Sequence, residues 1–232
     1  LGIVGAFFTL TIIRVGFFQR MMIVGVMLLF VVQSGLTFSR TGLGLAAGSI
    51  ALASLFLFRN ARTRLTIILL IVLGFLFVQY IMIPALDDFT NGYFTHRFSD
   101  TRSTGRVQIA ILDLQVWMEN PILGVGPGRA EIYRDERGIN ASAHTEFTRA
   151  LAEHGALGVL SIIVFLYIGI TRLLRARGAR TRALTVALMG WAVAFMMVSA
   201  FRLAAPALVF GLTFALLEME APRKRRFTYA GS

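Results

Sequence analysis

The sequence predicts an all-α protein: a polytopic bundle of transmembrane helices with one ordered, partly helical loop outside the membrane. Hydrophobic residues make up 56% of the 232 residues and charged residues only 15%, which is too little polar cover for a soluble surface. Apolar segments also recur at the length needed to cross about 30 Å of hydrocarbon as a helix. We therefore expect a single integral membrane domain over residues 1–232.

The apolar segments locate the individual spans. The first is too short to cross a bilayer alone, and the last two are short enough to form a tight hairpin around Pro206. The chain begins at Leu1 inside an apolar run, without an initiator methionine or a charged leader, so we expect a fragment that lacks N-terminal helices. The expected spans are 1–13, 21–38, 41–58, 65–86, 155–171, 183–201 and 203–219.

Basic residues cluster in the segments that connect these spans. Counting the spans puts all four clusters on one side, which the positive-inside rule assigns to the cytoplasm. The net charge of +11 therefore follows from topology, and nucleic-acid binding is not needed to explain it. We expect a multi-pass membrane protein. The clusters are Arg14 and Arg20; Arg59, Arg62 and Arg64; Arg172, Arg175, Arg177, Arg180 and Arg182; and Arg223, Lys224, Arg225 and Arg226.

The loop over residues 87–150 falls on the opposite, outer side. Loops of this length usually have a function or are disordered, and two helical patterns favour order. In "STGRVQIAILDLQVWMEN", Ser103 or Thr104 is a candidate N-cap. An apolar face follows at helical spacing and predicts an amphipathic helix lying on the membrane or on other helices. That face consists of Val107, Ala110, Ile111, Leu114, Trp117 and Met118.

The segment after this helix, "NPILGVGPGRA" over residues 120–130, is irregular. Asn120 precedes a proline and so predicts the helix end, and three glycines allow positive φ or close backbone approach. A second helix is expected from Ser142 to Gly155, with His144 in its first turn. Glu146 and Glu153 are expected to pair with Arg149 on its surface.

Four motifs in this order resemble the O-antigen ligase and polymerase superfamily of bacterial membrane glycosyltransferases. They are "SRTG" at 39–42, "STGRVQIA" at 103–110, "NPILGVGPG" at 120–128 and "AHTEFTRALAEHGALG" at 143–158. The resemblance covers most of residues 20–175. Thr145 departs from the pattern, because members commonly carry Asn, Ser or Gln directly after the histidine.

The resemblance implies a multi-pass protein of the bacterial inner (cell) membrane, whose loop over residues 87–150 faces the periplasm. It also implies transfer of a glycan from a polyprenyl-diphosphate carrier to a sugar hydroxyl on the periplasmic face. His144 is then the expected catalytic base, since its ordinary pKa of about 6.5 suits that work. Arg40, Arg106 and Arg129 are the expected diphosphate ligands, because guanidinium groups bind phosphate through two parallel hydrogen bonds. The outer segments offer no spaced metal ligands, so we expect neither a metal nor a cofactor.

Three kinds of acceptor share this donor chemistry. A ligase transfers to a lipid A-core sugar in lipopolysaccharide biosynthesis, and a polymerase transfers to another lipid-linked repeat of the polysaccharide. Transfer to a protein hydroxyl is the third. A transporter or flippase of polysaccharide precursors is the alternative from another class, but it favours ionisable residues within the spans, which are nearly absent here.

Overall fold

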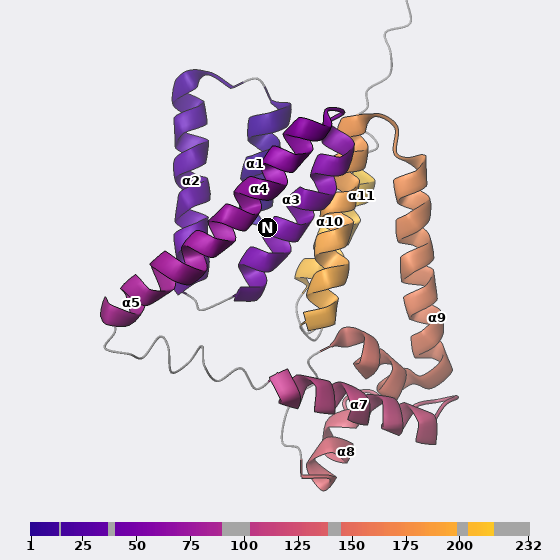
Figure 1. Ribbon diagram of the computed structural model, residues 1–232. Coiled ribbons are helices and arrows are strands. Elements are labelled where there is room, and N and C mark those ends of the chain that lie inside the picture. Colours follow the sequence, from indigo (N-terminus) through magenta and orange to yellow (C-terminus); the bar gives the residue numbers. More distant parts are fainter. Residues whose placement is uncertain (14, 37–39, 90–102, 139–144, 199–203, 216–232) are drawn as a thin grey trace, which may run out of the picture.

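The structure is a computed structural model of residues 1–232, and it describes all of them except 14, 37–39, 90–102, 139–144, 199–203 and 216–232. Within the described ranges the regular elements are all helices, which confirms the predicted fold class. The chain forms a bundle of long apolar helices with a smaller group of helices, α7, α8 and the first part of α9, packed at one end (Figure 1).

Apolar helices form the bundle. Among the described residues, four stretches are long and apolar enough to cross a membrane: Phe17–Ser34, Ala61–Met82, Glu146–Arg175 and Ala179–Val198. Three shorter apolar helices accompany them in the described part of the chain, and each of the seven overlaps one of the predicted segments. The elements are α1 (Gly2–Ile12), α2 (Phe17–Leu36), α3 (Arg40–Leu57), α4 (Ala61–Phe77), α5 (Ile83–Phe89), α9 (Glu146–Arg175), α10 (Ala179–Val198) and α11 (Ala205–Ala215).

The predicted span over 65–86 is continuous but irregular. A five-residue π-helical turn, Val78–Met82, joins α4 to α5. Pro84 follows in the first turn of α5, and its ring has no N–H to donate to the carbonyl four residues earlier. A local widening of the helix is one way to accommodate such a proline.

Small residues bring α3 and α10 together at the centre of the bundle. Ala46 and Ala53 on α3, and Ala183 and Ala187 on α10, are almost completely buried in one cluster with side chains of α1. Helices in lipid gain little from excluding water, so close backbone approach between small residues is what favours this packing. In contrast, α4 contains no buried residue.

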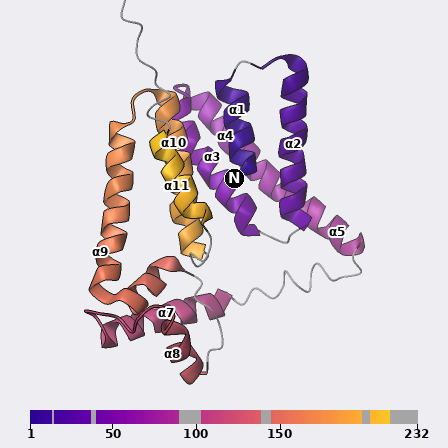
Figure 2. The ribbon, with the colours of Figure 1, turned by 180° about the vertical axis from the view of Figure 1, so that it is seen from behind.

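The helices outside the bundle come from the predicted periplasmic loop. They are α7 (Ser103–Glu119), α8 (Ala130–Glu136) and the first part of α9. Both views show α7 lying across the end of the bundle, with α8 on the side of α7 away from the transmembrane helices (Figures 1 and 2). The α3–α4 and α9–α10 connections, where two basic clusters lie in the sequence, are at the opposite end of the bundle.

The contacts of α7 with the other helices lie mainly on a different side from its predicted apolar face, which was expected on the membrane or on other helices. The helix instead buries Ile109, Leu112, Asp113 and Val116, which also follow helical spacing. Val107, Ile111 and Met118 of the predicted face are exposed. Helical spacing alone did not identify the buried side because α7 carries apolar residues on two opposite sides, and the contacts with α8 and α9 selected one of them.

Candidate functional site

The glycine-rich segment is bonded to the middle of α9. The amide groups of Val125 and Gly126 donate to the carbonyl oxygens of Ala152 and Glu153, at 2.9 and 3.0 Å. In return the amide of Ala156 donates to Ile122, at 3.0 Å. These three bonds provide partners for backbone groups that a straight α9 would have used internally. The segment therefore fixes a bend in α9.

The bend is centred on Gly155, where φ is +55° and ψ is −127°, a conformation that is essentially restricted to glycine. A Cβ atom at Gly155 would lie 2.6 Å from the amide nitrogen of Gly124, and one at Gly124 would lie 2.5 Å from the carbonyl carbon of Glu153. Both glycines are therefore needed for close backbone approach. Gly155 had been expected to end a helix, and it does separate the outer part of α9 from its membrane part.

A buried charged cluster ties the outer helices together. The guanidinium group of Arg134 on α8 donates to one carboxylate oxygen of Asp113 on α7, at 2.5 Å. The hydroxyl of Thr148 on α9 donates to the other oxygen, at 3.1 Å. The exposed fractions of the Asp113 and Arg134 side chains are 0% and 2%. Burial raises the pKa of Asp113 above its ordinary value, and the nearby Arg134 opposes that shift only in part.

Arg149 holds two carboxylates on the same helix. It pairs with Glu146 at 2.5 Å and with Glu153 at 3.0 Å, which confirms the predicted pairing. The prediction that these groups lie on the helix surface was wrong, because both glutamates are buried. Two nitrogens of the Arg149 guanidinium group donate to the two carboxylate oxygens of Glu146. This glutamate is therefore a fixed carboxylate at the beginning of α9.

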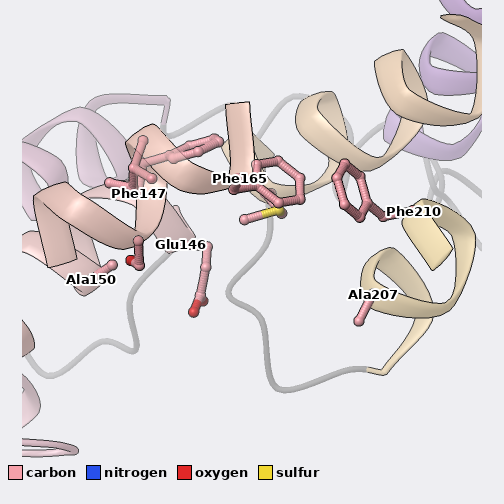
Figure 3. Close-up of a pocket in the computed structure, with 9 residues that line it drawn as sticks. Glu146, Phe147, Ala150, Phe165, Ala207 and Phe210 are labelled. Carbon is pink, nitrogen blue, oxygen red and sulfur yellow. The ribbon is translucent and has the colours of Figure 1, made fainter. Parts of the chain in front are cut away.

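Glu146 also borders a cavity of about 360 Å³ between α9, α10 and α11. Figure 3 shows Glu146 and Phe147 at one side of this cavity, and the rings of Phe165 and Phe210 at the other. Those two ring centroids are 4.4 Å apart. Apart from Glu146 and Ser161, the lining is apolar, a composition typical of small-molecule pockets with a few polar groups. The remaining lining residues are Ala150, Ile162, Met196 and Ala207.

The predicted site residues fall in different parts of this arrangement. Arg40 is the first residue of α3, but its side chain lies outside those described, and His144 lies outside the described residues. The described part of this segment begins at the adjacent Thr145, which has extended backbone angles and caps α9. The side chains of Arg106 and Arg129 are both exposed.

Along α7, Arg106 and Arg129 lie on opposite sides of the contact with the beginning of α9. Asp113 contacts Thr148, and further along both helices Val116 and Ala152 belong to one buried cluster with Ala130. The α7 helix and the outer part of α9 therefore run in the same direction. Arg106 is on the N-terminal side of both contacts. Arg129 directly precedes Ala130, which packs beside Val116. Val116 lies about 15 Å from Arg106 along the axis of α7, at about 1.5 Å per residue.

The beginnings of α3, α7 and α9 also lie toward the same side of the molecule in both views (Figures 1 and 2). The apolar cavity is bordered by the first residues of α9, so it belongs to the same region. A buried carboxylate and an apolar cavity thus lie together where the outer helices join the bundle.

Comparison with known proteins identifies the family. The model of the O-antigen ligase family matches residues 24–163, more than half of the chain. The chain belongs to the O-antigen ligase family. Membership implies an enzyme of glycan assembly in the membrane, acting on a lipid-linked glycan and an acceptor. Neither the curated proteins nor the solved structures contain a significant match to this O-antigen ligase family member.

The family match spans α3, α7, the glycine-rich segment and the bend of α9, so it includes every predicted site residue. In the part of the chain that the structure describes, no group of three or more histidine, cysteine or acidic side chains could hold a metal ion. The predicted independence from metal stays a prediction.

Sequence reasoning missed the two partners of the buried ion pair, Asp113 and Arg134. Neither was named as a candidate from the sequence. A signal for Asp113 was present, because it shares the 109–112–116 stripe of α7 with three apolar residues. An acidic residue within an apolar stripe predicts a buried carboxylate with a partner. No comparable signal marks Arg134, whose partner lies 21 residues earlier in the chain.

Proposed function

We propose that this protein transfers a glycan from a polyprenyl-diphosphate carrier to a sugar hydroxyl at the outer face of the inner membrane. The family match supports a ligase-type acceptor, such as a lipid A-core sugar. The observation that carries the proposal is the parallel packing of α7 on the outer part of α9. It favours a common site for Arg106 and for the segment that includes His144, next to an apolar cavity.

In the proposed reaction, His144 accepts the proton of the acceptor hydroxyl as its oxygen attacks the anomeric carbon of the donor sugar. The bond from that carbon to the phosphate oxygen breaks, and the lipid diphosphate leaves with the electron pair. Negative charge therefore develops on the diphosphate, and fixed arginines stabilise it. Arg40 and Arg106 are the proposed main ligands, with Arg129 a weaker one because of its distance along α7.

The lipid carrier gives the cavity a role in this proposal. A polyprenyl chain is apolar and remains in the bilayer while its diphosphate lies at the interface. A cavity with aromatic and aliphatic walls and one polar end suits a molecule that has an apolar chain and a charged head group. Glu146 is held by Arg149, so its charge is neutralised within the protein and repels the diphosphate less.

The test is glycan transfer in vitro, with donor binding measured separately on each purified variant. His144→Ala should lower turnover about 10²- to 10⁴-fold with donor binding largely intact, because a general base acts in the transition state. Arg106→Ala should weaken donor binding more than Arg129→Ala does, and lysine should restore it poorly.

The matched control is Arg137→Ala. Arg137 is an exposed arginine of the same outer helices, but its side chain pairs with Glu119, and exposed pairs contribute little to stability. Normal turnover in His144→Ala would refute the role of the base. Equal donor binding by Arg106→Ala and Arg137→Ala would refute the arginine ligand.

A further inference from the structure

The cluster of Asp113, Arg134 and Thr148 joins three helices through one carboxylate. Each oxygen of Asp113 has a different partner: Arg134 from α8 and the Thr148 hydroxyl from α9. The carboxylate is completely buried. Asp113 therefore adds a directional hydrogen bond between α7 and the start of α9 to the apolar packing of these helices.

Stability alone does not explain a charged cluster at this position. A buried ion pair loses hydration on both partners, and apolar residues of similar volume are often as stabilising or more so. The neighbouring contact between Val116, Ala130 and Ala152 shows that these same helices also pack through apolar side chains. What the carboxylate adds is a hydrogen bond of defined direction to Thr148.

Thr148 is placed to transmit that direction to the first turn of α9. Its amide donates to the Thr145 hydroxyl at 3.4 Å, and its own hydroxyl also lies 3.5 Å from the Thr145 carbonyl oxygen. Thr145 is the N-cap of the helix and directly follows His144 in the chain. Glu146, at the edge of the cavity, is the next residue. The bond to Asp113 thus sets the rotation of the turn that bears these groups.

We propose that Asp113, Arg134 and Thr148 are positioning residues for glycan transfer, which hold the first turn of α9 in its working orientation. This inference rests on the proposed function, because it assumes that the segment containing His144 acts on the acceptor. The three residues do not touch substrate in this account; they act through α9.

The decisive variant is Thr148→Val, which keeps the size of the side chain and removes its hydroxyl. We expect kcat to fall about 10- to 100-fold, since a displacement of about 1 Å at a reacting group can cost that much. The KM for the lipid-linked donor should stay within about two-fold, because Arg106 is on another helix. Thr148→Ser restores the hydroxyl and should recover most of kcat.

The control is Thr171→Val, on the membrane part of the same helix. The Thr171 hydroxyl donates only to Ile168 within its own turn, so kcat should be unchanged. A second variant, Asp113→Leu with Arg134→Met, removes the charges together and keeps the helices packed through apolar contact. Its thermal unfolding should resemble that of the native protein, while its kcat falls as in Thr148→Val.

Normal kcat in Thr148→Val, or in the folded double variant, would overturn the inference. An equal loss in Thr148→Ser would also overturn it, because the hydroxyl would then not be the cause. A donor KM raised as much as kcat is lowered would assign the cluster to binding instead. These results would refute only the positioning role of the cluster. The proposed function is refuted by a different result, normal turnover in His144→Ala.

Discussion

Replacing Gly124 with alanine should break the connection between the glycine-rich segment and α9. The φ of Gly124 is +67°, and an alanine in this region costs about 1–2 kcal/mol. Its Cβ would also lie 2.5–2.6 Å from backbone atoms of Glu153 and His154. Backbone cannot move aside as a flexible side chain can, so the two segments must separate.

That separation would break the three backbone hydrogen bonds that join them. At about 0.5–1.5 kcal/mol each, their loss adds about 2–4 kcal/mol to the conformational cost. Gly128→Ala is the matched control. Its φ of +76° is similar, but nothing lies within 4 Å of the added Cβ, so it should show the conformational cost alone.

Hydrogen–deuterium exchange measures this difference locally. The amides of Val125, Gly126 and Ala156 are the three donors, and their protection reports the free energy of opening. A difference of about 2–4 kcal/mol between the variants corresponds to about 30- to 1,000-fold faster exchange in Gly124→Ala than in Gly128→Ala. Exchange rates equal within about three-fold would refute the argument that close approach requires this glycine.

Four further predictions concern the charged cluster, the topology and the metal. Arg134→Met alone should lower the free energy of unfolding by about 3–5 kcal/mol, because it leaves a buried carboxylate without its ion pair. Adding Asp113→Leu should recover most of that loss, and thermal unfolding in detergent measures both effects. Because burial raises the pKa of Asp113, the folded protein binds this proton more tightly than the unfolded chain. The free energy of unfolding should therefore rise, relative to Asp113→Asn, as the pH falls toward the ordinary aspartate pKa of about 4, and a relative fall would contradict the sign. In this cysteine-free chain, Gln108→Cys should react with a membrane-impermeant thiol reagent from the periplasmic side and Arg177→Cys only from the cytoplasmic side, so the reverse pattern would refute the topology. Glycan transfer should survive chelation by EDTA; activity lost on chelation and restored by magnesium or manganese would show that arginines alone do not neutralise the diphosphate.

Much of the fold was predictable from local sequence. Each apolar segment recovered as a helix is long enough to satisfy its own backbone hydrogen bonds, so its identity does not depend on which helix lies beside it. The end of α7 at Glu119 and the bend at Gly155 were also predictable, because proline and glycine act on the backbone directly. The pairing of Arg149 with Glu146 and Glu153 is similarly local, since helix geometry brings such spacings together.

What the sequence by itself determined about this protein is therefore its membrane class, its helices, the breaks between them and the motifs of its family. The tertiary structure alone decided which side of α7 is buried, that the glycine-rich segment bonds to α9, and that Arg106 and Arg129 lie at different ends of the outer helices. It also decided that Asp113 and Arg134, 21 residues apart, form a buried pair. The physical reason is that these features depend on contacts between helices. An exposed charge and a buried one look alike along the chain, and only the packing of α8 and α9 against α7 removes one of them from water.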